Sequence, residues 1–230
     1  MCRKMRFVLL FMVFLSVYSC SSRDKKHNGP ASPELLYLDY QLNAEAGDDK
    51  LTLKFRFLDE EDGDVFSLPA GAGLFLDGEE LQADSTKGSG VFYEVHKEME
   101  TFAGIHEVEL RNQGKTLLTD HFSFRPIRPV YDIPDTIDRG DLLLELEGLE
   151  PEDYIRTTAT DTAFYNPGVN RLDTIKNGQY FLAANELGKL HSGPVQLLLQ
   201  REWELYLEGE NGPRGKKSLN FLLKKEIYLR

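Results

Sequence analysis

In the first half of the chain, from residue 35 to residue 124, apolar residues recur at every second position rather than with helical spacing. The clearest example is the run LTLKFRFL at 51–58, where apolar side chains alternate with Thr, Lys and Arg. Such alternation is typical of a strand with one face in a core and the other in water. Further strands are predicted by the runs at 36–42, 91–95, 106–110 and 117–124.

Turn signals separate these runs. The Asn112-Gln113-Gly114 link joins two alternating segments and predicts a hairpin. No segment of this half has the periodicity of a helix. Short strands separated by turns over about 90 residues are typical of an immunoglobulin-like sandwich.

The stretch RPIRP at 125–129 interrupts the strand pattern, because two prolines three residues apart suit neither a helix nor a central strand. We place a domain boundary there. Strand patterns resume afterwards, and Asn177-Gly178 predicts a two-residue turn between the strands on either side of it. The predicted strands of this half are 142–146, 154–158, 162–165, 179–183, a long run at 195–207 that is expected to bend, and 219–229.

The N-terminus has the features of a signal peptide. A basic segment is followed by a twelve-residue apolar run from Phe7 to Tyr18, which is shorter than the roughly 20 residues that a membrane-spanning helix needs. Ser19 and Cys20 end this run, and Val-Tyr-Ser-Cys resembles the lipobox of bacterial lipoproteins. The resemblance implies cleavage between Ser19 and Cys20 and lipid on the Cys20 sulfur, which anchors the protein in a membrane. An ordinary secretory signal peptide is the alternative.

The predicted fold class is therefore all-β: two tandem immunoglobulin-like β-sandwich domains after a lipoprotein signal peptide and a short tether. The predicted boundaries are 1–19 for the signal peptide, 20–32 for a flexible tether, 33–126 for the first sandwich and 127–230 for the second. The tether, CSSRDKKHNGPAS, is polar and lacks an apolar run.

Composition and charge exclude several classes of protein and of binding site. The content of 41% hydrophobic and 28% charged residues is ordinary for a globular protein. The net charge of -11 argues against a nucleic-acid partner. Both cysteines, Cys2 and Cys20, precede the predicted domains, so we expect no disulfide and no cysteine-ligated metal in the folded part.

An acidic turn follows the strand at 51–58. It contains Asp59, Glu61, Asp62 and Asp64, and grouped carboxylates on a loop are ligands that calcium prefers. The spacing does not match an EF-hand, because aligning Gly63 with the sixth position of that motif places non-ligating residues at both ends. A solvated loop is the favoured interpretation and calcium binding is the alternative; we expect no other cofactor.

Aromatic residues near the end of the second half suggest a ligand site. Trp203 is the only tryptophan, and with Tyr206 it is a candidate for stacking on a sugar ring. The two residues are three apart, so a regular strand would direct them to opposite faces. A core tryptophan is the favoured interpretation.

Nothing in the sequence indicates catalysis. The five histidines are scattered without ligand-like spacing, and the chain has neither a Gly-x-Ser-x-Gly elbow nor a phosphate-binding glycine loop. We therefore predict that the protein is not an enzyme.

The strand and acidic turn together, LTLKFRFLDEEDGD, resemble a group of uncharacterised cell-envelope lipoproteins of the Bacteroidota. In that group a strand with two alternating phenylalanines enters a turn that ends in Asp-Gly-Asp, as Phe55, Phe57 and Asp62-Gly63-Asp64 do here. Glu60 and Glu61 stand where the group often has glycine. The resemblance covers the lipobox and much of the first half. It implies an immunoglobulin-like fold and an outer-membrane location, with surface and periplasmic orientations both open.

The expected function is that of a structural or interaction module of the cell envelope. The membrane, through lipid on Cys20, and an envelope protein are the expected partners. A glycan-binding accessory lipoprotein of an outer-membrane uptake system is the alternative, and an exposed Trp203 would favour it. A pilus subunit is a variant of the first class, in which the last strand, 219–229, would be left free for exchange with another subunit.

Overall fold

The structure is a computed structural model that describes residues 32–150, 153–163, 166, 168–207 and 213–230. The predicted signal peptide, with Ser19 and Cys20, lies outside these residues, as does almost all of the tether. Among the described residues, no helix has the length and apolar character needed to cross a membrane. The fold is built almost entirely from strands, with a single short α-helix in the described ranges, α2 (Ala184–Leu187).

Five strands of the first half lie where the alternating pattern predicts them, whereas the four shorter strands between residues 65 and 86 are not among the predicted runs. The strands of this half are, in chain order, β1 (Tyr37–Glu45), β2 (Lys50–Leu58), β3 (Val65–Phe66), β4 (Ala72–Leu76), β5 (Glu79–Glu80), β6 (Ala83–Thr86), β7 (Gly90–Glu98), β8 (Gly104–Asn112) and β9 (Lys115–Phe124). A short 3-10 helix, η2 (Pro33–Leu35), precedes them. The predicted hairpin is confirmed: β8 and β9 pair in antiparallel, and Gln113 and Gly114 both have positive φ at the turn.

The second half contains β10 (Arg128–Pro129), β11 (Thr136–Ile137), β12 (Leu142–Glu147), β13 (Tyr154–Asp161), β14 (Val169–Thr174), β15 (Gln179–Leu182), β16 (Gly193–Leu207) and β17 (Arg214–Leu229). The strand predicted at 162–165 is wrong at its start, because Thr162 and Ala163 lie in a bend after β13; residues 164 and 165 are outside the described ranges.

The prediction for Asn177-Gly178 is right about the turn and wrong about the strands that it joins. Both residues have positive φ, as a tight two-residue turn requires. However, β14 pairs with β13, whereas β15 pairs with β12 in another sheet. The chain changes sheets at Ile175, which lies between the end of β14 and the turn and is buried in the core.

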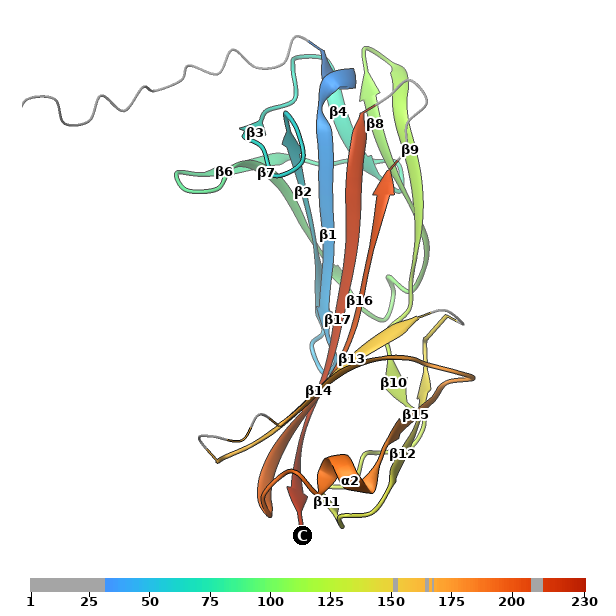
Figure 1. Ribbon diagram of the computed structural model, residues 1–230. Helices are drawn as coiled ribbons and strands as arrows, with labels where there is room; N and C mark the ends of the chain where they lie inside the picture. The colour runs from blue at the N-terminus through green and yellow to red at the C-terminus, as the bar shows by residue number, and fades with distance from the viewer. Residues whose placement is uncertain (1–31, 151–152, 164–165, 167, 208–212) are drawn as a thin grey trace, which may run out of the picture.

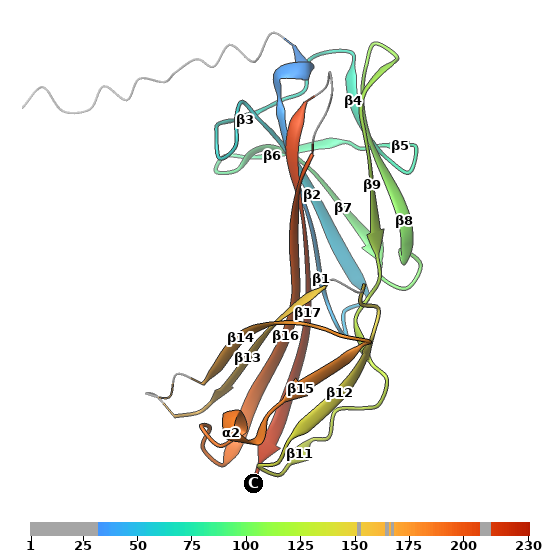
Figure 2. The ribbon, with the colours of Figure 1, turned by 45° about the vertical axis from the view of Figure 1, so that its right-hand side comes forward.

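Three sheets form the molecule. The largest has the strand order β14-β13-β16-β17-β1-β2-β7-β6, with β3 and β11 pairing at its sides. The sheet β5-β4-β8-β9 lies against it in the first half, and β10-β12-β15 lies against it in the second half (Figure 2). Two sandwiches thus share one long sheet, and the all-β sandwich prediction is confirmed.

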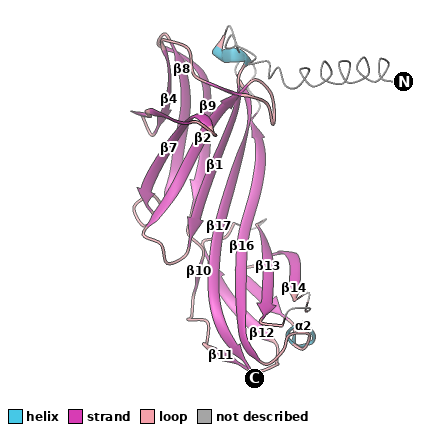
Figure 3. Ribbon diagram, turned by 90° about the vertical axis from the view of Figure 1, so that its left-hand side faces the viewer, coloured by secondary structure: helices cyan, strands magenta, loops and turns pink. Residues whose placement is uncertain are grey.

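The two last strands run through both halves. β16 and β17 form an antiparallel hairpin of 15 and 16 residues that extends along almost the whole body (Figures 1 and 3). In the first half, β17 pairs in parallel with β1 from Tyr37↔Arg214 to Glu45↔Leu222. Residues assigned from sequence to the second domain therefore also complete the large sheet of the first, and pairing continues across the predicted boundary.

The packing differs between the halves. In the first, aromatic rings fill the space between the sheets, and Tyr40 stacks on Phe55 with ring centroids 5.2 Å apart. In the second, the buried side chains are mostly aliphatic and come from both sheets.

Candidate functional site

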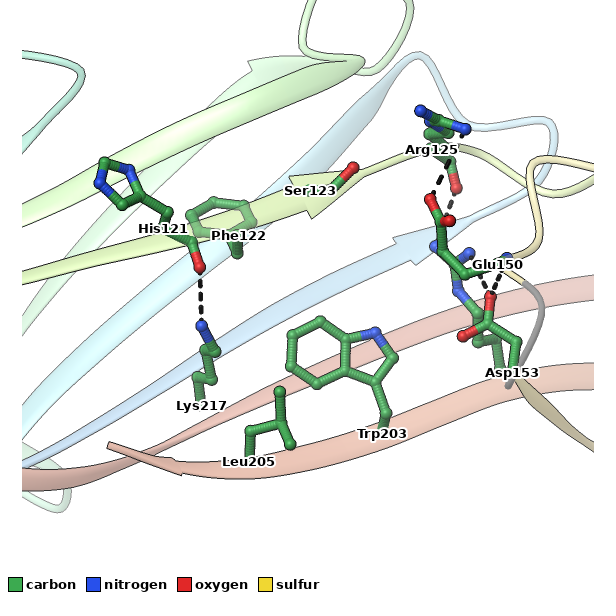
Figure 4. Close-up of a pocket in the computed structure, with 10 residues that line it drawn as sticks. His121, Phe122, Ser123, Arg125, Glu150, Asp153, Trp203, Leu205 and Lys217 are labelled. Carbon is green, nitrogen blue, oxygen red and sulfur yellow. Dashed lines mark hydrogen bonds and ion pairs between the residues drawn. The ribbon is translucent and has the colours of Figure 1, made fainter. Parts of the chain in front are cut away.

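A cleft of about 350 Å³ lies where the two halves meet, between β9 of one sheet and β16 of the other (Figure 4). Both strands end their sheets at this point: β9 is the last strand of its sheet, and β13 leaves β16 uncovered beyond Arg201. The residues that line the cleft are His121, Phe122, Ser123, Arg125, Glu150, Asp153, Arg201, Trp203, Leu205 and Lys217.

At the floor of the cleft, Arg201 joins the two halves. Its side chain is only 3% exposed. It donates to the carbonyl oxygens of Arg125 (2.9 Å) and Gly148 (2.7 Å) and to the Asp153 carboxylate (3.1 Å). Burial lowers the pKa of this guanidinium, and the charge of Asp153 opposes that effect. Two loops that meet at the boundary, the one after β9 and the one between β12 and β13, are thus held by one side chain from β16.

Gly148 is part of the same joint. Its φ is +85°, and a Cβ added there would lie 2.1 Å from the carbonyl oxygen of Pro126. A side chain is therefore excluded at this position. The backbone approaches closely enough for the Gly148 carbonyl to accept the hydrogen bond from Arg201.

A second charged group connects the two sheets of the first half. Lys217 on β17 donates to both oxygens of Asp120 on β9, at 2.7 and 2.9 Å, and to the carbonyl oxygen of His121 at 2.8 Å. Tyr40 on β1 donates to the same Asp120 carboxylate. Burial, together with this hydrogen bond, raises the pKa of Tyr40 well above its ordinary value. Neither this group nor Arg201 was identified from sequence, because the partners are 48 to 97 residues apart in the chain.

Trp203 lies on the inner face of β16 and is half-buried against the core. The Lys217 ammonium lies 6.0 Å from the centroid of its ring, within the range of a cation–π contact. The next inward residue, Leu205, is 53% exposed. The interpretation of Trp203 as a wholly buried core residue is therefore incomplete, since part of the ring faces the cleft.

Tyr206 is directed away from this cleft. Its hydroxyl donates to Glu61 at 3.2 Å, and it lines a different pocket with Leu35 and the acidic turn. Trp203 and Tyr206 therefore do not form one aromatic platform, as their odd spacing predicted. The structure instead brings Tyr206 beside Glu61, two residues that the sequence analysis had placed in separate candidate sites.

The acidic turn is organised by its own side chains. The Asp59 carboxylate accepts hydrogen bonds from the backbone N–H groups of Glu60 (3.0 Å) and Asp64 (2.8 Å). A Cβ at Gly63 would lie 2.0 Å from the Asp59 Oδ1, and Asp62 has a φ of +60°. This geometry gives the Asp-Gly-Asp motif a structural role as a closed turn.

Calcium binding by Asp59, Glu61, Asp62 and Asp64 stays a prediction. Within the described ranges, no three or more His, Cys, Asp or Glu residues are grouped so that they could hold a metal ion. Asp59 faces the backbone of its own turn, and Glu61 contacts Tyr206 and Lys216.

In the second half, Asp161 holds together the loops at one end of the sandwich. Its carboxylate accepts hydrogen bonds from the backbone N–H groups of Ala163 and His191 and from the Asn166 amide. These bonds, led by the one from His191, lower the pKa of Asp161 far below its ordinary value. The Asp-Thr-Ala sequence at 161–163 is an Asx-turn signal that could have indicated this role.

Comparisons with known proteins do not assign this chain to a family. No model of a protein family matches the chain, and no curated protein matches it. Solved structures that match include the first two immunoglobulin domains of DIP-gamma, with 10% identity, 81% of this chain and 94% of that chain covered, and a TM-score of 0.23. Two structures of titin match similarly: A168–A169 at 14% identity (82% and 96% covered, TM-score 0.23), and A168–A170 at 12% identity (84% and 65% covered, TM-score 0.24). Likenesses at this level carry no argument about function.

Proposed function

We propose that this protein is a lipid-anchored, non-catalytic interaction module of the cell envelope. The observation that carries the proposal is the β16–β17 hairpin, which passes through both halves and makes them one continuous body. The described chain begins at one end of this body and finishes at the other (Figure 1). A body of this kind, tethered at its first residues, extends its far half away from the membrane.

The anchor in this proposal is lipid on Cys20, with cleavage after Ser19. The sequence supports it through the basic segment, the short apolar run and the lipobox-like Val-Tyr-Ser-Cys. We propose an outer-membrane location from the resemblance to Bacteroidota lipoproteins, and an envelope protein as partner. Removing 1–19 takes away three basic residues and no acidic ones, which changes the net charge from -11 to -14 and favours a basic partner.

The pilus variant receives no support from the last strand. β17 pairs with β16 on one side and, along its N-terminal part, with β1 on the other, and β11 pairs with its final residues Tyr228 and Leu229. This strand is therefore built into the sheet of its own chain. A subunit that donates its last strand would need it free.

Glycan binding is the second candidate function, and the partly exposed ring of Trp203 in the cleft favours it. A sugar site of this kind would use one aromatic ring with Lys217 and Arg125 at its sides. It would not include Tyr206, which lines the other pocket. A glycan array probed with the chain from Ser21, and repeated with Trp203→Ala, tests this candidate directly.

The anchoring is tested with Cys20→Ser in a bacterium that processes lipoproteins, using metabolic labelling with palmitate and membrane fractionation. We expect Cys20→Ser to abolish labelling and prevent maturation. Cys2→Ser, which changes the only other cysteine, should leave both unchanged. Persistent labelling of Cys20→Ser, or its loss in Cys2→Ser, would contradict the proposed anchor.

A further inference from the structure

One segment of β16 lacks a strand partner on one side. β16 pairs with β17 along its whole length, but with β13 only from Val195 to Arg201. Beyond that point, among the described residues, no strand pairs with the other side of residues 202–207, which we call the free edge. Backbone groups of a strand point alternately to its two sides, so every second residue here directs its N–H and C=O out of the sheet.

The inner face is uncovered at the same residues. Leu199, Arg201 and Leu207 all point inward from β16 and are buried. Between them, Trp203 is half-buried and Leu205 is 53% exposed. Inward positions of a sandwich strand are normally covered by the facing sheet. The same short segment of β16 therefore lacks both a neighbouring strand and a facing sheet that covers its inward side chains.

On the opposite wall of the cleft, two carbonyl oxygens are already hydrogen-bonded to side chains of the large sheet. On β9, the carbonyl oxygen of His121 accepts from Lys217, and just beyond this strand the carbonyl oxygen of Arg125 accepts from Arg201. Figure 4 shows the Lys217 side chain reaching across to His121 on β9, with Trp203 and Leu205 beside it. These two carbonyl oxygens are thus already paired with cations, whereas no strand among the described residues pairs with this side of residues 202–207 of β16.

We propose that the free edge is a docking site for one extended strand of a different protein, which adds to the large sheet beside β16. This inference rests on the proposed function as an interaction module and names the surface that it uses. Main-chain hydrogen bonds supply the affinity in this mode of recognition, and alternate side chains supply the specificity.

The side chains of the free edge define the chemistry of the partner. Apolar side chains of the incoming strand would cover Trp203 and Leu205 on the inner face. On the outer face, Glu202 and Glu204 each form one ion pair within the chain, with Arg156 at 3.3 Å and with Lys216 at 3.5 Å, and both carboxylates are still about half exposed. Cross-strand neighbours of opposite charge are favoured, so the partner strand carries Lys or Arg at the outward positions. The net charge of -11 favours the same choice.

A second copy of this chain fits the edge less well. Antiparallel self-pairing centred on Glu204 places that carboxylate opposite itself, and centring on Trp203 places Glu202 opposite Glu204. Centring on Leu205 places Leu207 of the copy opposite Trp203 without a like-charge pair, and the dimerisation measurement below tests this register. The first two registers favour a partner that supplies a separate strand.

The test attaches a strand to the chain itself. The described chain begins close to the free edge, because Leu35, Tyr206 and Leu207 line one pocket. We replace residues 1–32 with the strand TVKVKVT and a flexible Gly/Ser linker of about ten residues, which gives an effective concentration in the millimolar range. Trp203, as the only tryptophan, reports on the cleft by its fluorescence.

We expect this fusion to raise the melting temperature by about 3 °C and to shift the Trp203 emission to shorter wavelength, relative to the same linker alone. The reordered strand TVVKKVT, of identical composition, should do neither. Replacing lysine by glutamate in the strand should reduce the gain. Equal effects of the alternating and reordered strands would overturn the proposal.

A matched pair of variants locates the effect. Leu205→Lys in the fusion should abolish the gain, whereas Leu172→Lys, at an equally exposed leucine on the edge strand β14, should leave it unchanged. Loss of the gain in both variants would overturn the assignment to β16. Dimerisation of the unfused chain at micromolar concentration, removed by Leu205→Lys, would assign the edge to a second copy instead. A negative result here leaves the Cys20 labelling result unaffected, so the two proposals fail separately.

Discussion

The two halves of the molecule share β16 and β17 but complete their sandwiches differently. In the second half, β13 and β14 continue the sheet beyond β16, and the inward residues of β16 are buried. In the first half the same strand ends the sheet, and its inward residues Trp203 and Leu205 are partly uncovered. One strand is therefore a central strand at one end and an edge strand at the other, which shows that exposure is set by the neighbours rather than by the residue pattern.

The two halves also differ in the ion pairs and hydrogen bonds that connect their sheets and loops. The first half connects its sheets through the Lys217–Asp120 ion pair and Tyr40, in the middle of the sandwich. The second half uses Asp161 to hold loops at its end. Arg201 belongs to neither half alone, since it binds segments at their boundary. We therefore expect substitutions in the two halves and at their boundary to differ in their effect on stability, and four such predictions follow from these contacts.

The largest expected effect is at the joint. Arg201→Ala should lower the free energy of unfolding by about 3–5 kcal/mol, because it leaves the Arg125 and Gly148 carbonyl oxygens and the Asp153 carboxylate without a buried donor. Urea denaturation followed by circular dichroism measures this loss. Arg156→Ala, which removes an exposed pair with Glu202, should cost less than about 1 kcal/mol. Equal costs would contradict the role of Arg201 as the joint.

The tie inside the first sandwich should come next. Lys217→Ala should cost about 3 kcal/mol, because the Asp120 carboxylate then lies between the sheets without its cation. Adding Asp120→Asn should recover part of that loss, since the remaining group is neutral. A double-mutant cycle measures the coupling. Strictly additive losses would mean that the pair does not act as a unit.

A smaller effect is expected at the acidic turn. Gly63→Ala should cost about 1–2 kcal/mol, because its Cβ displaces the Asp59 carboxylate from the backbone N–H groups that it accepts from. Gly88→Ala, in another turn of the first half with open space around the added Cβ, should be nearly neutral. Thermal unfolding of the two variants compares them. A neutral Gly63→Ala would show that the Asp-Gly-Asp turn has no structural requirement for glycine.

The last effect is confined to acid pH and to the second half. Because the folded pKa of Asp161 is lowered, its contribution to stability is present above the unfolded pKa of about 4 and is lost as the pH falls below it. The natural protein should therefore lose more stability between pH 5 and pH 2 than Asp161→Asn does, as measured by urea midpoints at each pH. Asp48→Asn, at an exposed loop position, should keep the acid dependence of the natural protein. The same dependence in Asp161→Asn would contradict the role of Asp161.

The sequence by itself determined the all-β class, most strand positions and the β8–β9 turn. These are local properties: alternation reports which face of a strand is buried, and Gln113-Gly114 supplies the positive φ values that the turn requires. It also separated Trp203 from Tyr206, since residues at odd spacing in a strand face opposite ways.

Only the tertiary structure decided which strands are neighbours. The alternation of residues 195–207 and 219–229 is the same whether they stay in one domain or extend into both. The crossing at Asn177-Gly178, the pairing of β17 with β1, the Arg201 joint and the free edge of β16 all depend on contacts between segments that are distant in the chain. Which strands pair depends on how all the apolar side chains of both cores are buried together. The residue pattern of a single strand does not contain that information.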